Sequence, residues 1–137
     1  MKHSQIFVNL PVKDLKRAVD FYAKVGYTFN PQFTDDTAAC MVIDAEHIFA
    51  MLLTHAKFEQ FLPKATTIAA ADTTEVLVCL SCASRAEVDD LARKAVAAGG
   101  TIFRDPQDHG FMYSHAFRDL DGHIWEVMWM DPAAVSS

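Results

Sequence analysis

The sequence lacks the features of a membrane-spanning or secreted protein. None of its apolar runs approaches the roughly 18 residues that are needed to cross a bilayer. Its first residues, Met1 to Gln5, contain no apolar signal core with a small-residue cleavage site, and a short apolar stretch with Pro11 follows at once. We therefore expect a soluble protein of the cytoplasm that has no membrane partner.

The sequence is also poor in positive charge. Its 137 residues include 12 Lys and Arg against 18 Asp and Glu, which gives a formal net charge of −6. No cluster of Lys and Arg resembles the basic patch with which proteins contact the phosphates of nucleic acids. The composition therefore argues against nucleic acid as a partner.

Cysteine is scarce as well. Cys40, Cys79 and Cys82 cannot all pair within one chain, and all three lie in apolar stretches. Cys79 and Cys82 have C-x-x-C spacing, but no second C-x-x-C or C-x-x-H accompanies them, and residues three apart on a strand point to opposite faces. We therefore interpret the thiols as small core residues in a reducing compartment.

The hydrophobic content of the sequence is enough for one folded domain. Hydrophobic residues make up 51% of the chain, aromatic residues 11% and charged residues 22%. A chain of this length typically buries roughly two-thirds of its unfolded surface. These fractions exclude disorder as the main state, and the length leaves no room for two independent cores of ordinary size.

The first half of the chain predicts the element order β-α-β-β-β. A short apolar strand at residues 6–10 precedes a helix at 15–25, in which apolar residues recur at helical spacing. Asp14 is well placed as the N-cap of this helix, and Gly26 as the residue that ends it. Polar turns separate the three strands that follow, at residues 27–33, 38–43 and 48–53.

The second half repeats this order. A strand at residues 75–82 is followed by Ser84 and Glu87, which have the S-x-x-E spacing of a capping box and predict the start of a helix that ends at Gly99. Residues 119–122 predict a tight turn between the last two strands. The three strands of this half after the helix lie at residues 101–103, 111–117 and 123–130.

The two copies indicate a single α+β domain built from a tandem βαβββ repeat. Module one covers about residues 5–62 and ends with a short helix capped by Thr54, a linker covers about 63–74, and module two covers about 75–131. A unit of roughly 60 residues is marginal by itself. We therefore expect the two modules to pair, so that their curved sheets form a cleft.

Two segments resemble a known family. One is the run Val12-Lys13-Asp14 with Phe21-Tyr22 and Gly26, and the other is the run from Phe117 to Glu126. Both are similar to the vicinal-oxygen-chelate superfamily, which includes glyoxalases (lactoylglutathione lyases), bleomycin-resistance proteins and extradiol dioxygenases. The resemblance covers about residues 5–131 and implies a glyoxalase-like, half-open barrel with a metal in its cleft, commonly in a homodimer.

The resemblance also implies where metal ligands would lie. Members of this superfamily place His or Gln on the first strand and Glu on the last strand of a module, and such a set suits Zn, Ni, Fe or Mn. Here the first-strand positions align with Phe7 and Leu77, and the last-strand positions with Met51 and Glu126. Because only Glu126 matches, we expect no cofactor, with a divalent metal as the alternative. Glu126 would then be an isolated acid in an apolar wall.

Other residues are candidates for contact with a ligand or for proton transfer. Asn9 and Cys79 lie two residues beyond Phe7 and Leu77, on the same strand faces. Tyr113 and His115 share a strand face and could act as acid and base on a carbonyl or phenol, although the same alternation also suits a solvent-facing pair. His109 precedes Gly110 in a segment that could form a lid or pocket wall.

Two classes of function therefore remain open. The first is a small-molecule binding protein that sequesters a partly apolar ligand, with ligand contacts from Phe7, Asn9, Met51, Leu77, Cys79 and His109. The second is a divalent-metal-dependent lyase or extradiol dioxygenase with a rearranged site. In that class Glu126, Tyr113 and His115 would be the catalytic residues, with Glu126 holding any metal.

Overall fold

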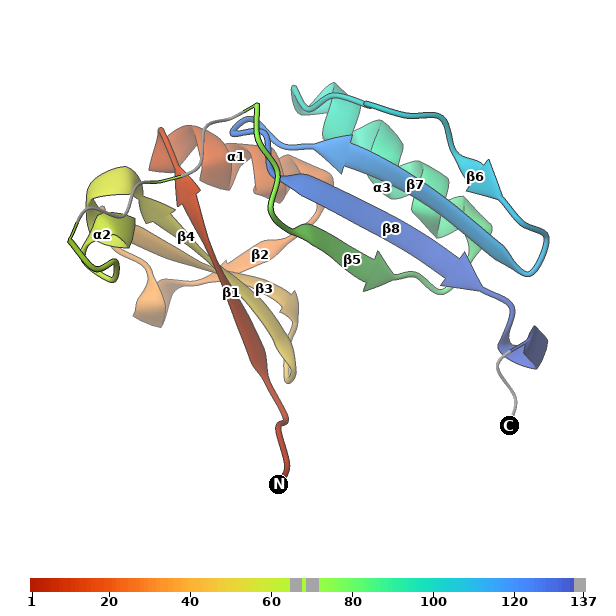
Figure 1. Cartoon of the computed structure of the whole chain (residues 1–137), viewed down its shortest axis with the longest axis horizontal. Helices are drawn as coiled ribbons and strands as arrows, with labels where there is room; N and C mark the ends of the chain where they lie inside the picture. Colours follow the sequence, from red (N-terminus) through yellow and green to blue (C-terminus); the bar gives the residue numbers. More distant parts are fainter. Residues whose placement is uncertain (65–67, 69–71, 135–137) are drawn as a thin grey trace. The chain divides into compact units, whose positions relative to one another are not determined.

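The structure is a computed structural model, which describes residues 1–64, 68 and 72–134. The chain divides into two compact units, Met1–Ala70 and Ala71–Ser137. Each unit contains one four-stranded mixed sheet and a helix of at least ten residues, and neither sheet closes into a barrel (Figure 1). The predicted α+β class and the two tandem modules are therefore confirmed.

The first unit follows the predicted order. Its sheet has the strand order β1-β4-β3-β2, with β1 parallel to β4 and the other pairs antiparallel. In chain order its elements are β1 (Ile6–Val12), α1 (Leu15–Val25), β2 (Thr28–Asn30), the 3-10 helix η1 (Pro31–Phe33), β3 (Ala38–Asp44), β4 (Ile48–Thr54) and α2 (His55–Glu59).

Helix α1 begins and ends where the sequence predicts. The Asp14 carboxylate accepts a hydrogen bond from the backbone N–H of Arg17 at 3.1 Å. Gly26 ends the helix with φ of 122°, a conformation that side chains disfavour. The apolar stripe of the helix packs on β3 and β4 and supplies four buried side chains, Ala18, Phe21, Tyr22 and Val25.

Proline changes two of the predicted strands in this unit. The strand predicted at residues 27–33 ends at Asn30, because Pro31 has no N–H for the ladder and starts η1, where the Asn30 side chain accepts from the N–H of Gln32 at 3.0 Å. The strand predicted at 6–10 instead continues through Pro11 to Val12. Strand β1 is an edge strand, where a missing N–H is tolerated.

The second unit repeats the first. Its sheet has the order β5-β8-β7-β6, with β5 parallel to β8. Helix α3 packs on β7 and β8 and buries Val88, Ala92 and Ala95 (Figure 1). The elements are β5 (Leu77–Ser81), α3 (Arg85–Ala97), β6 (Gln107–Asp108), β7 (Met112–Arg118), β8 (Ile124–Met130) and the 3-10 helix η2 (Pro132–Ala134).

The turn between β7 and β8 is held by one buried carboxylate. Asp119 is only 6% exposed, and its Oδ1 accepts from the N–H groups of Asp121 and His123, both at 2.9 Å. Gly122 completes the turn with φ of 86°. The predicted tight turn at residues 119–122 is thus confirmed.

The prediction of a strand at residues 101–103 is wrong. Only Thr101 pairs, as an isolated bridge to Arg118, and the fourth strand of the sheet is β6, four residues further along. Pro106 lies between the bridge and β6 and offers no N–H to a ladder. The segment between Thr101 and β6 is therefore a loop, and it carries Arg104.

The thiols differ from the core residues that we predicted. Cys40 is buried, but Cys82 is only partly buried and Cys79 is exposed on β5. Partial burial raises the pKa of Cys82 to about 11. The prediction of core packing is therefore confirmed for Cys40 and wrong for Cys79.

The connection between the modules starts as predicted. The Thr54 hydroxyl accepts from the N–H of Lys57 at 3.2 Å and caps α2. The predicted linker at 63–74 lies partly outside the described residues, at 65–67 and 69–71. Among the described residues, no helix is long and apolar enough to cross a membrane.

The N-cap of α3 gives a direct test of the local structure. The Ser84 hydroxyl accepts from the N–H of Glu87 at 3.1 Å. Ser84→Ala leaves this N–H without its partner and should lower the free energy of unfolding by about 1 kcal/mol in a urea titration. Ser4→Ala is the matched control, since Ser4 contacts His47 through its backbone oxygen. Equal unfolding midpoints for the two variants would contradict the cap.

Candidate functional site

The side of the second sheet that α3 does not cover carries the candidate site. Strand alternation puts Trp125 and Trp129 on the side of α3 and Glu126 on the other side. We call this other side the Glu126 face. It is formed by alternate residues of three strands: Leu77, Cys79 and Ser81; Ile124, Glu126, Met128 and Met130; and Met112, Ser114 and Ala116.

In both sheets the first strand of the module pairs with the last strand in the same register. Cys79 lies opposite Glu126 across the β5–β8 pair, and Asn9 lies opposite Met51 across the β1–β4 pair. Met51 therefore occupies in the first sheet the position that Glu126 occupies in the second. This agrees with the assignment of both residues to equivalent last-strand positions.

Glu126 is not the isolated acid that the sequence predicts. Arg104, in the loop between α3 and β6, places its Nη2 3.1 Å from Oε1 of Glu126. The two side chains are only 24% and 26% exposed, so the pair is largely shielded from water. A half-buried carboxylate needs such a partner because an unpaired charge there is costly. The expectation of a lone carboxyl is therefore wrong.

Arg104 also contacts an aromatic ring, and one of its nitrogen atoms has no hydrogen-bond partner among the described residues. Its guanidinium carbon lies 5.8 Å from the centroid of the Phe103 ring, and Arg118 approaches the same ring at 5.0 Å. Among the described residues, Nη1 of Arg104 is the one buried side-chain nitrogen or oxygen atom without a hydrogen-bond partner. Nη2 of the guanidinium is thus engaged by Glu126, and Nη1 is an unsatisfied donor.

Cys79 lies beside this ion pair. The pKa of its thiol is raised, mainly by desolvation and then by the negative charge of Glu126, while the positive charge of Arg104 opposes the shift. A thiol with a raised pKa stays protonated near neutrality and is a poor nucleophile. Cys79 therefore offers the site a neutral, polarisable surface.

The first sheet carries the other residues that we predicted to contact a ligand. Phe7, Asn9 and Met51 share one face of β1 and β4, because they occupy alternate, paired positions. Phe7 is 48% exposed, and its ring stacks on Phe49 with centroids 4.8 Å apart and planes 12° apart. This face therefore presents an aromatic surface with one amide, that of Asn9, which is exposed.

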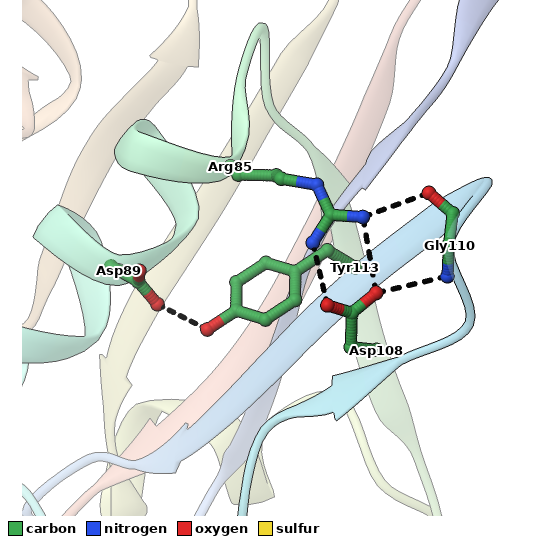
Figure 2. Close-up of polar contacts among 5 residues, drawn as sticks. All are labelled: Arg85, Asp89, Asp108, Gly110 and Tyr113. Atoms are coloured by element: carbon green, nitrogen blue, oxygen red, sulfur yellow. Dashed lines mark hydrogen bonds and ion pairs between the residues drawn. The ribbon is translucent and has the colours of Figure 1, made fainter.

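Tyr113 and His115 lie on the opposite side of the second sheet from Glu126. The Tyr113 hydroxyl donates to Asp89 of α3 at 2.5 Å, and this bond raises the pKa of Tyr113 to about 12 (Figure 2). Nδ1 of His115 accepts from the N–H of Ala116 at 2.9 Å. The structure therefore brings these two residues together with α3 and does not bring them to Glu126.

Arg85 ties the β6–β7 hairpin to α3. Its guanidinium donates to both oxygens of Asp108, at 2.9 and 3.0 Å, and to the carbonyl of Gly110 at 2.8 Å (Figure 2). The same group lies 5.2 Å from the Tyr113 ring centroid and 5.1 Å from that of Trp129. These contacts define the position of the segment that carries His109.

His109 itself is an exposed residue of this hairpin. Its ring centroid lies 6.4 Å from that of Phe111, and its backbone N–H donates to the carbonyl of Met112 at 2.9 Å. The hairpin is held by a guanidinium and a carboxylate whose sequence separation is 23 residues, so the sequence did not reveal this arrangement.

Residues 4–127 match the family model described as the Glyoxalase/Bleomycin resistance protein/Dioxygenase superfamily. This match covers most of the chain. The protein belongs to this superfamily. No curated protein matches the sequence.

Solved structures of the superfamily and of related proteins have the same fold. The hypothetical protein SA1046 from S. aureus is 28% identical, with a TM-score of 0.76 over 94% of this chain and 95% of that one. TioX from Micromonospora sp. ML1 is 25% identical, with a TM-score of 0.64 over 93% and 98%. A glyoxalase/bleomycin resistance protein/dioxygenase family enzyme from Burkholderia phytofirmans PsJN is 18% identical (TM-score 0.74, 90% and 96%) and shows the fold alone.

The residues present do not fit the metal that the superfamily resemblance implies. Phe7, Met51 and Leu77 have no nitrogen or oxygen ligand to offer, and the carboxylate of Glu126 already pairs with a guanidinium. Nor do the described residues contain a group of three or more His, Cys, Asp or Glu side chains that could hold a metal ion. The positive charge beside Glu126 is that of Arg104.

The ion pair can be tested by a double-mutant cycle. Arg104→Gln and Glu126→Gln each leave one charged partner alone in a half-buried position. The cycle should therefore give a coupling free energy of about 0.5–2 kcal/mol from urea unfolding. Arg118→Gln is the matched control, because Arg118 shares the Phe103 ring with Arg104. Coupling of Glu126 to Arg118 that equals its coupling to Arg104 would contradict the assignment.

The Arg85 contacts predict a pH effect. The hydrogen bonds that Arg85 donates, with a smaller contribution from the Gly110 N–H, lower the pKa of Asp108 from 3.8 to about 2. The stabilisation is present above about pH 4 and is lost as the pH falls towards 2. Arg85→Gln should raise this pKa towards 3.8 in an NMR titration of the carboxyl carbon, whereas Arg93→Gln, which affects Asp90, should leave it low. An unchanged pKa in Arg85→Gln would refute the assignment.

Proposed function

We propose that this protein binds a small, partly apolar molecule without the help of a metal. The observation that carries the proposal is the chemistry of the residues at the four positions where the family resemblance places metal ligands. Three of them, Phe7, Met51 and Leu77, are apolar, and the fourth, Glu126, is paired with Arg104. A lyase or dioxygenase of the kind that uses a divalent metal needs at least three protein ligands at such a site.

Exposed apolar surface supports binding. Phe7 is 48% exposed and Leu77 is 53% exposed, although both are large hydrophobic residues on sheet faces. Covering such surface releases roughly 25 cal/mol per Å² of apolar area. An aromatic or aliphatic ligand on Leu77 would gain this free energy, and the ion pair of Glu126 with Arg104, within the same unit, would orient its polar part.

Two groups that could react on a ligand, the Cys79 thiol and the Tyr113 hydroxyl, are not prepared for reaction. The Cys79 thiol has a raised pKa and is protonated, and the Tyr113 hydroxyl, with its pKa of about 12, points to α3. Neither group is set up as a nucleophile or a base near neutral pH. Sequestration of a ligand requires neither role, which is why we favour a binding protein over an enzyme.

The test uses the neutral fluorescent probe N-phenyl-1-naphthylamine. The purified protein should bind it with the same dissociation constant before and after treatment with EDTA. Leu77→Lys should weaken binding about fivefold or more, because a charge replaces apolar contact area. Val76→Lys is the matched control, since Val76 is 60% exposed but precedes β5.

Three outcomes would overturn the proposal. They are the absence of probe binding, the loss of binding on removal of metal, and equal weakening by Leu77→Lys and Val76→Lys. Loss of binding with the metal would instead support the lyase or dioxygenase class.

A further inference from the structure

One buried donor of Arg104 has no acceptor among the described residues. A buried charged donor without an acceptor is costly, and native structures rarely leave one without a compensating group. Nη1 of Arg104 is such a donor among the described residues. The guanidinium is always protonated, so this atom can only donate.

We propose that Arg104 binds an anionic oxygen of the ligand, such as that of a carboxylate or a sulfonate, through Nη1, the guanidinium nitrogen that has no partner among the described residues. This inference rests on the proposed binding function and names its ligand class. It assigns Arg104 as a ligand-binding residue of the Glu126 face.

The existing contacts orient the guanidinium for this role. Glu126 holds Nη2 at 3.1 Å and Phe103 lies under the group, so the plane of the guanidinium is defined before a ligand arrives. A planar guanidinium has two donor edges and binds a carboxylate or sulfonate through either of them. With Nη2 engaged by the protein's own carboxylate, Nη1 is left to donate to an anion.

The ligand would approach this donor from the exposed part of the side chain. Nη1 itself is buried, but the Arg104 side chain as a whole is 24% exposed, so part of it reaches the surface beside the buried donor. The apolar part of the ligand would then lie on the neighbouring surface of Leu77 and the neutral thiol of Cys79. The ligand class is therefore an apolar body with one anionic oxygen group.

The formal net charge of −6 does not attract anions to the protein as a whole. Preference for an anionic ligand must therefore come from a local positive group. Such a preference would depend on Arg104 and not on arginine residues elsewhere on the surface.

Two fluorescent probes that share an apolar body separate the two proposals. 8-Anilinonaphthalene-1-sulfonate carries a sulfonate, and N-phenyl-1-naphthylamine is its neutral counterpart. Arg104→Gln should weaken binding of the sulfonate about tenfold and that of the neutral probe less than twofold. Arg118→Gln should change neither, because Arg118 contacts the same ring but does not pair with Glu126.

One more measurement keeps the test decisive if Arg104→Gln fails to fold, which circular dichroism would reveal. In the wild-type protein, benzoate should displace the sulfonate probe at concentrations at which benzamide does not.

The outcomes are distinguishable. If the neutral probe does not bind the wild-type protein, the proposed function fails. If the neutral probe binds but Arg104→Gln leaves the affinity for the sulfonate unchanged, or if benzamide competes as well as benzoate, only the assignment of Arg104 is overturned.

Discussion

A β-strand points successive side chains to opposite faces of its sheet, and this constraint determines which residues of the protein can share a site. In each module one face of the sheet packs against a helix, α1 or α3. The other face receives Phe7, Asn9 and Met51 in the first module and Leu77, Cys79 and Glu126 in the second. The same alternation separates Tyr113 and His115 from Glu126, although all three had been considered together as catalytic residues.

The parts of the fold that sequence reasoning predicted depend on short-range chemistry. The Asp14 and Ser84 caps, the Gly26 stop and the turn at Asp119 are each specified by residues that lie within about five positions of one another. The repeat of these signals was enough to predict two βαβββ modules. Strand ends were less certain because they depend on pairing, as the early end of β2 at Asn30 shows.

The candidate site was only half predictable. Its sheet residues followed from alternation and from the family resemblance, but Arg104 did not, because it lies 22 residues from Glu126 in a loop, directly after the residues 101–103 that were predicted as a strand. One signal was present in the sequence, since a carboxylate in an apolar wall requires a cation. The second module contains several arginines, Arg104 and Arg118 among them, and only the fold shows that Arg104 pairs with Glu126.

These features describe a member of the superfamily in which a protein side chain supplies the positive charge beside Glu126. The measurement that tests this most directly is elemental analysis of protein purified without chelator, then incubated with zinc, nickel, iron or manganese and desalted. Our account predicts far less than one equivalent of any metal in both the wild type and Glu126→Gln. One tightly held equivalent in the wild type that Glu126→Gln loses would contradict it.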